Sequence, residues 1–257
     1  MEPLHVTEWG SGEPVVLLHG TRSWGTRSFA AQEELAGRGY RLLVVDRRGF
    51  GRSPDAPRED FEQDARDLLE LLAEPAHVVA HSYGAVGSLL AAAERPGAIR
   101  TLALIEPGTL TLARGRPEVD AFLAEAERFY AAPTWTTPEE FLAAMAQAIG
   151  DEEPPPLTPE ERRAVETSMA GRHVWEAEIP ADRLVEPPFP SLVVTGALLR
   201  EGRSRIVREA LIAAADAAAE LLGSERLRVP GAGHSPHSER PEPVNAALLR
   251  LWAQSRP

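Results

Sequence analysis

Short, continuous runs of hydrophobic residues alternate along the chain with helical patterns. The runs are rich in Val, Ile and Leu and do not alternate strictly with polar residues, which is typical of strands buried on both faces of a parallel sheet. They lie at residues 14–18, 40–45, 77–80, 101–105, 191–195 and 226–229. Helical segments follow most of them, at residues 29–36, 61–73, 85–94, 205–222 and 243–254. This order predicts a doubly wound α/β architecture with a mostly parallel sheet.

One long segment, residues 113–186, interrupts this order because it holds helical patterns without a convincing strand. We therefore predict a core of residues 1–112 and 187–257, with residues 113–186 forming a helical cap, or lid, over the edge of the sheet. A second independent domain is the alternative. The short segment returns to a strand of the same type, which favours the cap. The helical patterns within it cover residues 117–130, 138–149 and 159–169.

The composition excludes several chemistries. All 27 basic residues are arginine, so a Schiff-base lysine, a pyridoxal phosphate anchor and a P-loop lysine are ruled out. The chain of 257 residues has no cysteine, which rules out disulfides, thiol nucleophiles and iron–sulfur clusters. Few catalytic strategies remain after both exclusions.

The net charge of −12 disfavours nucleic acid and anionic membranes as partners. The first residues lack a basic and apolar signal pattern, and no run approaches the roughly 20 apolar residues that span a bilayer. We expect a cytoplasmic protein that acts on a small molecule, partly apolar in character. The sequence leaves the oligomeric state open.

Three residues with potentially catalytic side chains follow predicted buried strands at once or within a few positions. Ser82 comes after residues 77–80, Glu106 after 101–105 and His234 shortly after 226–229. Ligands of open parallel sheets bind beyond the carboxyl ends of the strands. A serine, a carboxylate and a histidine are therefore expected on one rim of the sheet, in the chain order Ser…Glu…His.

The motifs around these residues resemble those of the α/β-hydrolase superfamily over almost the full chain. Ala80-His81-Ser82-Tyr83-Gly84 is similar to the G-x-S-x-G nucleophile elbow, with alanine in place of the first glycine. His19-Gly20, the D-x-R-G-x-G-x-S block at Asp46–Ser53 and the G-x-G-H-x-P-H block at Gly231–His237 occur in the family's order. The resemblance implies an α/β-hydrolase fold.

The resemblance also implies roles by position. Ser82 would be the nucleophile and His234 the base that takes its proton, while the backbone N–H groups of Thr21 and Tyr83 would form the oxyanion hole. This implies a cofactor-free serine hydrolase that cleaves an ester, a lactone or a thioester through an acyl-enzyme. We expect no metal, because the His234-x-x-His237 spacing lacks an accompanying HExxH motif.

The third triad member departs from the usual pattern. Most relatives place an aspartate in the loop after the strand that matches residues 191–195, but Leu199 holds that position here. Adjacent parallel strands lie about 4.8 Å apart, so the end of the strand after the nucleophile's helix is close to Ser82. We predict Glu106 as the acid. Glu201, or no acid at all, remains an alternative.

Substrate choice is expected to depend on aromatic side chains near the site. We predict that the substrate pocket is lined by Trp24, Phe129, Trp135 and Trp175, with Phe122 and Phe141 as further candidates from the cap. The arginines from Arg200 to Arg208 are interpreted as a solvated helix start, with attraction of an anionic substrate as the alternative. The same triad would also serve a C–C bond hydrolase, an acyl transferase or a cyclase. Leu199 favours a non-catalytic ligand-binding protein, whereas intact Ser82 and His234 favour catalysis.

Overall fold

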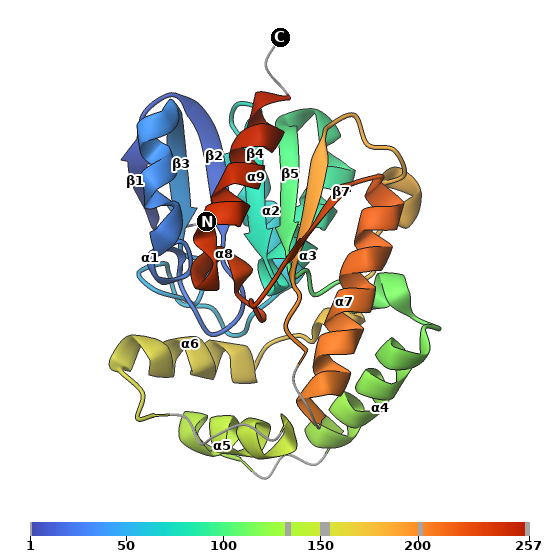
Figure 1. Ribbon diagram of the computed structural model, residues 1–257. Coiled ribbons are helices and arrows are strands. Elements are labelled where there is room, and N and C mark those ends of the chain that lie inside the picture. Colours follow the sequence, from blue (N-terminus) through green and yellow to red (C-terminus); the bar gives the residue numbers. More distant parts are fainter. Residues whose placement is uncertain (1, 132–134, 150–154, 200–202, 255–257) are drawn as a thin grey trace.

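The computed structural model describes residues 2–131, 135–149, 155–199 and 203–254. Its strands are β1 (Val6–Gly10), β2 (Glu13–Leu18), β3 (Tyr40–Val45), β4 (Ala76–His81), β5 (Ile99–Ile105), β6 (Ser191–Gly196) and β7 (Glu225–Val229). Within the described residues these strands form one sheet in the order β1-β3-β2-β4-β5-β6-β7 (Figure 1). Neighbours run parallel, except that β1 is antiparallel to β3. The predicted mostly parallel α/β sheet is confirmed.

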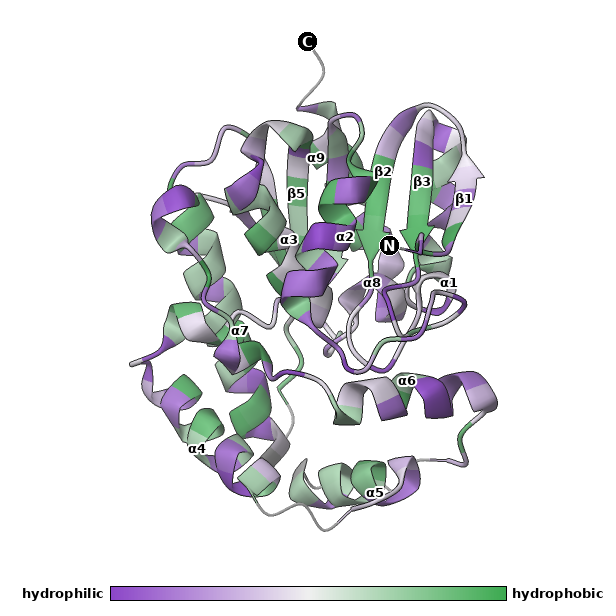
Figure 2. Cartoon of the chain, turned by 180° about the vertical axis from the view of Figure 1, so that it is seen from behind, coloured by the Kyte–Doolittle hydropathy of each residue, from purple (hydrophilic) through white to green (hydrophobic). Residues whose placement is uncertain are grey.

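All six predicted strands are present, and β1 is the strand that the sequence pattern misses. This strand lies at the sheet edge, and its residues are half-buried or exposed. Figure 2 shows β1 as paler than the hydrophobic strands beside it. An edge strand with one open side needs no continuous hydrophobic run, so Val6–Gly10 carries no clear strand signal.

The α-helices follow the predicted positions closely. They are α1 (Gly25–Ser28), α2 (Phe61–Leu71), α3 (Tyr83–Glu94), α4 (Pro117–Ala131), α5 (Pro138–Ile149), α6 (Pro159–Met169), α7 (Arg203–Leu222), α8 (Pro236–Glu239) and α9 (Pro241–Ala253). Short 3-10 segments are η1 (Ala30–Arg38), η2 (Pro96–Ala98), η3 (Leu110–Ala113), η4 (Val174–Glu176) and η5 (Ala181–Arg183). The helix predicted at residues 29–36 is thus a 3-10 segment. Such a segment rises about 2.0 Å per residue instead of 1.5 Å, so it spans more distance on the way to β3.

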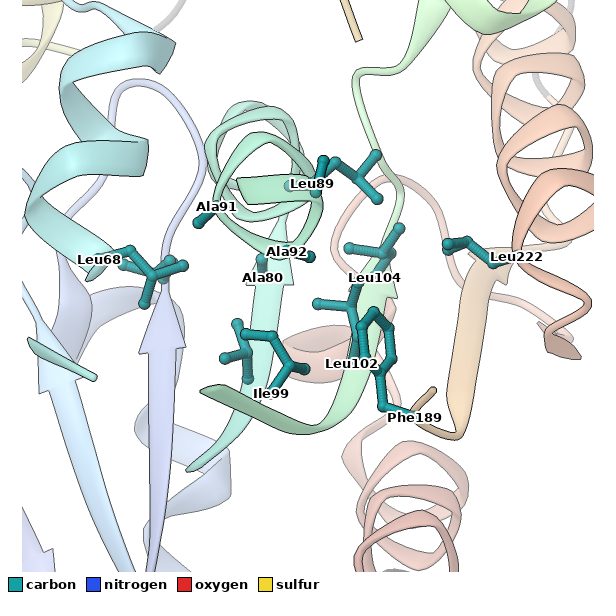
Figure 3. Close-up of a cluster of buried hydrophobic side chains, with 14 of the residues drawn as sticks. Leu68, Ala80, Leu89, Ala91, Ala92, Ile99, Leu102, Leu104, Phe189 and Leu222 are labelled. Carbon is teal, nitrogen blue, oxygen red and sulfur yellow. The ribbon is translucent and has the colours of Figure 1, made fainter. Parts of the chain in front are cut away.

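Both faces of the sheet are covered, which explains the continuous hydrophobic runs. Alternate residues of a strand point to opposite faces. Val16 and Leu18 of β2 pack in one cluster with α2, α3 and α7, whereas Val15 and Leu17 pack in a second cluster with η1 and α9. Figure 3 shows part of the first cluster around Leu104 of β5. The sheet is therefore a rigid base for the loops at its carboxyl edge.

Helices α4, α5 and α6 lie beyond the carboxyl ends of the parallel strands (Figures 1 and 2). Helix α4 packs along α7, where Val119 and Leu123 share a buried cluster with alanines of α7. Helix α6 is tied to the loop after β3, since Thr167 Oγ1 donates a hydrogen bond of 2.8 Å to the Gly49 carbonyl. Its start is fixed by a capping box between Thr158 and Glu161.

Among the described residues, no helix has the length and apolar character that crossing a bilayer requires.

Candidate active site

Ser82 sits in a tight, strained turn between β4 and α3. Its backbone has φ 52° and ψ −112°, a conformation that non-glycine residues rarely adopt and that concentrates at functional sites. The turn is held by hydrogen bonds from Ser82 N to the Ile105 carbonyl, 2.9 Å, and from Gly108 N to the Ser82 carbonyl, 3.1 Å. The Ser82 side chain lines both cavities described below.

The elbow requires small neighbours on both sides. A Cβ atom at Gly84 would lie 2.6 Å from the His19 carbonyl oxygen, and one at Gly20 would lie 2.9 Å from Cβ of Ser82. Both contacts are shorter than a Cβ atom tolerates. Ala80, which replaces the first glycine of the motif, is fully buried and accommodated. The sequence therefore forms the turn with two essential glycines.

His234 reaches Ser82 from the loop that follows β7. Its Nε2 lies 3.0 Å from Ser82 Oγ, within hydrogen-bond distance. The loop is clamped by Glu239, whose carboxylate accepts hydrogen bonds from the backbone of Gly233, 2.7 Å, and of Ser235, 2.9 Å. The His81 ring also donates a hydrogen bond of 2.8 Å to the His234 carbonyl.

Glu106 ends β5 and points to the other nitrogen of the same imidazole. Its Oε2 lies 3.4 Å from His234 Nδ1, and the side chain is fully buried. Burial raises the pKa of Glu106, but hydrogen bonds from His234 and Arg208 outweigh it and hold the pKa below its usual value. The structure thus brings Ser82, His234 and Glu106 together. Leu199 is half exposed, and Glu201 lies outside the described residues.

Arg208 is a partner of Glu106 that the sequence interpretation missed. Its Nη1 donates a hydrogen bond of 2.7 Å to Oε2 of Glu106, and its Nη2 donates one of 3.0 Å to Oε1. Oε1 also accepts a bond of 2.6 Å from Gly196 N. The interpretation of this arginine as part of a solvated helix start is wrong, because Arg208 is buried. The sequence does contain an indication that Arg208 is buried, because it lies on the same face of the helix as the buried Ala215 and Leu222.

The predicted oxyanion-hole residues flank the nucleophile. Tyr83 begins α3, and the N–H groups of a first helical turn have no partner within the helix. Among the described residues, no acceptor is found for the backbone N–H of Tyr83 or Thr21. The Thr21 hydroxyl is anchored by hydrogen bonds with Glu59 Oε2, 2.7 Å, and Ser168 Oγ, 2.6 Å.

Two cavities meet at Ser82 and His234. The larger has a volume of about 460 Å³ and is bordered mainly by polar residues of the loops after β2 and β7, together with α6. The smaller has a volume of about 200 Å³ and a strongly aromatic wall. That wall includes Phe122, Tyr130, Phe141, His173 and Trp175. Both cavities also share Thr21 and Arg22.

Only part of the predicted aromatic lining reaches the cavities. Trp175 lines the smaller cavity, but Trp24, Phe129 and Trp135 are on the walls of neither. Phe129 and Trp135 stack on each other with ring centroids 4.5 Å apart and lie behind Phe141, which Trp135 contacts. Trp24 lies under the Arg27 guanidinium instead, 5.0 Å from it. Helix orientation decides which aromatic ring faces the cavity, and Tyr130 takes the place expected for Phe129.

Two further histidines support the wall beside His234. The rings of His81 and His237 lie 4.6 Å apart, and His81 lies 5.0 Å from His234. Burial lowers the pKa of His237 to about 3 and that of His81 well below its usual value, so both rings are neutral in the working range. Within the described residues, no group of three or more side chains is arranged as metal ligands.

Residues 15–247 match the Alpha/beta hydrolase family, and the chain belongs to that family. It is 32% identical over 260 residues to a pimeloyl-[acyl-carrier protein] methyl ester esterase of Methylococcus capsulatus, covering 92% of this chain and 94% of the relative. It is 31% identical over 186 residues to lipase LipV of Mycobacterium tuberculosis, covering 69% and 68%.

Solved structures show the same fold. A thermophilic esterase from Thermogutta terrifontis superimposes with a TM-score of 0.65 at 23% identity, over 99% of this chain and 94% of that one. The family and the fold predicted from the sequence are confirmed. The prediction of an enzyme, a hydrolase of the α/β fold, is confirmed as well.

Proposed function

We propose that the protein hydrolyses carboxylic esters, including lactones or thioesters, through an acyl-enzyme on Ser82. The contact of 3.0 Å between His234 Nε2 and Ser82 Oγ carries this proposal, because a serine becomes a nucleophile when an adjacent base takes its proton. The similarity to a methyl ester esterase and to a lipase supports the ester as the bond that is cleaved.

In the proposed reaction, Ser82 Oγ attacks the carbonyl carbon while His234 Nε2 accepts the hydroxyl proton. The backbone N–H groups of Thr21 and Tyr83 donate hydrogen bonds to the developing oxyanion. The tetrahedral intermediate collapses, His234 returns the proton to the leaving alcohol, and the acyl group stays on Ser82. Water then repeats the sequence, so that the acid is released and Ser82 is restored. No step uses a cofactor.

Glu106 is the proposed acid of this triad. Its contact with His234 Nδ1 favours the tautomer with the proton on Nδ1, which leaves Nε2 free to accept the proton of Ser82. The lowered pKa of Glu106 keeps the carboxylate charged, so that it stabilises the imidazolium formed during attack. Arg208 and Gly196 N fix the carboxylate in place.

Residues 113–186 are the proposed cap on a core of residues 1–112 and 187–257. Helices α4–α6 lie beyond the strand ends where Ser82 is found, and Phe122, Phe141 and Met145 from α4 and α5 border the smaller cavity. This arrangement makes the cap the source of substrate selectivity.

The test is a set of p-nitrophenyl esters of increasing acyl length, combined with labelling by a fluorophosphonate. We expect turnover and rapid labelling of one residue, both lost in Ser82→Ala beyond a small residual rate. Ser11→Ala, which changes an exposed serine in the turn between β1 and β2, should keep both. Labelling that persists in Ser82→Ala would overturn the assignment. Ligand binding without turnover would instead identify a non-catalytic member of the family.

A further inference from the structure

Arg22 is placed beside the reacting groups in a conformation that side chains rarely adopt. It follows Thr21 directly, has φ 56° and lines both cavities together with Ser82 and His234. Backbone strain of this kind persists only where surrounding contacts hold it, and it concentrates at ligand clamps. Here the Arg22 N–H donates a hydrogen bond of 3.3 Å to Ser168 Oγ of α6.

The Arg22 guanidinium lines the cavities without a salt-bridge partner on the described walls. Among the described residues, its side chain has no ion pair, and its Nη1 contacts only the weak acceptor Met145 Sδ, at 3.5 Å. The other arginine and glutamate side chains on the walls are all in ion pairs. These pairs are Arg27–Glu161, Arg172–Glu62 and Glu59–Arg47, and Arg47 is shared with a second carboxylate, that of Asp64. Arg22 is thus a charged side chain of the described walls that has no salt-bridge partner, although Glu59 is close enough to raise its pKa.

The surroundings of Arg22 make an anionic partner favourable. The residue remains accessible, and both cavities open onto it. Even so, burial lowers the pKa of Arg22, while the nearby Tyr130 and Glu59 raise it in part. The guanidinium keeps its proton. Because Arg22 is exposed toward both cavities, its N–H groups can donate charge-assisted hydrogen bonds to an anionic group of a bound ligand.

We propose that Arg22 binds a carboxylate carried by the ester substrate, so that the enzyme prefers monoanionic esters such as hemiesters of dicarboxylic acids. This inference rests on the proposed function and names the substrate class for the same site. A planar guanidinium pairs with a planar carboxylate through two parallel hydrogen bonds. A single guanidinium without a salt-bridge partner pairs with one carboxylate, so a monoanionic ester fits this site.

The test compares matched anionic and neutral esters. The first arm uses monoethyl esters of succinic, glutaric, adipic and pimelic acids against ethyl esters of unbranched monocarboxylic acids of equal chain length. The second arm places the carboxylate on the alcohol, using acetylated 3-hydroxypropanoate and 4-hydroxybutanoate against propyl and butyl acetate. The readout is the ratio of kcat/KM for the anionic ester to that for its neutral partner.

We expect a ratio well above one in at least one arm. Arg22→Gln should lower that ratio about tenfold or more, mainly through KM, since the ion pair forms in both ground and transition states. Arg22→Lys keeps the charge but loses the planar fork, so it should restore part of the ratio. Arg38→Gln removes the same charge from a site outside both cavities and should leave the ratio unchanged.

A measurement on the unmodified enzyme keeps the test independent of whether the variants fold. Raising the salt concentration should lower the ratio, because ions screen the pair. A ratio at or below one in both arms, or the same ratio in Arg22→Gln, would overturn the inference while leaving neutral ester turnover as evidence for the proposed function. Absent turnover of every ester, with no labelling of Ser82, would overturn the proposed function itself.

Discussion

Arg208 holds Glu106 through two hydrogen bonds, of 2.7 and 3.0 Å, while His234 Nδ1 lies 3.4 Å from the same carboxylate. The proposed acid is thus shared between a buried guanidinium and an imidazole. The cation supplies part of the stabilisation that keeps Glu106 charged despite full burial. In this chain, a carboxylate at the end of β5 is held by an arginine of α7.

The first prediction concerns Arg208→Met, which removes the cation but leaves Glu106 buried. Because burial raises the pKa of Glu106 and the opposing bonds from Arg208 are lost, the pKa should rise. The acid limb of kcat/KM, measured from pH 5 to 9, should therefore move to higher pH. Arg208→Lys should restore part of the shift.

Arg205→Gln is the matched control for this prediction. Arg205 lies on the same helix, is exposed and pairs with Glu209. Its variant should show the unmodified pH profile. If Arg208→Met lowered activity equally at all pH values, Arg208 would be structural support and not a positioning residue for the acid.

Glu106→Gln should lower kcat by roughly 10⁴-fold, the loss described for the equivalent change in a serine protease. Gly196 N–H and Arg208 would attract the amide oxygen, which turns the amide NH₂ toward His234 and favours the unproductive tautomer. Leaving Arg208 buried without its anion should also cost roughly 3–5 kcal/mol of stability. Circular dichroism and a thermal melt separate the two effects, since activity is measured where the variant is folded. Near-full activity would place the acid elsewhere.

The strand ends were predictable because burial on both faces of the sheet leaves continuous apolar runs in the sequence. Ser82 and Glu106 end up close since β4 and β5 are parallel neighbours, with His81 opposite Ile105. This proximity follows from topology alone. The structure brings the two residues and His234 together, while their roles in catalysis remain predictions.

Features that depend on tertiary orientation were not predictable to the same extent. A charged side chain such as Arg208 has its usual place at the surface, and only a partner on another strand reverses that preference. Phe129 and Tyr130 are adjacent on α4, and the rotation of the helix decides that Tyr130 borders the cavity. For Arg22, no pattern in the sequence indicates that this arginine lacks a salt-bridge partner while Arg27 and Arg172 have one.

A further prediction concerns stability in acid. Burial lowers the pKa values of the buried His19, His81 and His237, and lowers that of the half-buried His173 as well. Below about pH 6.5, the three buried histidines alone let the unfolded chain bind up to three protons more than the folded chain. Asp64 opposes this effect by one proton, because burial raises its pKa to about 6 and the folded state takes up its proton first. The net difference approaches two protons between pH 6 and pH 5.

Stability should therefore fall by roughly 2–3 kcal/mol per pH unit over that range. Urea unfolding at pH 7.5, 6.5, 5.5 and 5.0 measures the slope. His237→Gln removes one titrating histidine, so the difference in bound protons that sets the slope should fall by about one. Arg38→Gln should leave the slope unchanged. A flat dependence between pH 6.5 and 5 would show that these histidines are not neutral in the folded protein.

The last prediction separates residues that line the smaller cavity from residues behind it. Trp175 borders this cavity of about 200 Å³, whereas Phe129 stacks on Trp135 and does not reach it. Trp175→Ala should enlarge the space next to Ser82, so the preferred p-nitrophenyl ester should shift toward longer or bulkier acyl groups. Phe129→Ala should lower the melting temperature through lost packing but leave the order of preference among the esters unchanged. Measuring kcat/KM across the series for both variants tests this contrast. An unchanged order in Trp175→Ala, or an altered one in Phe129→Ala, would show that selectivity depends on the wider packing of α4 and not on the ring at the wall.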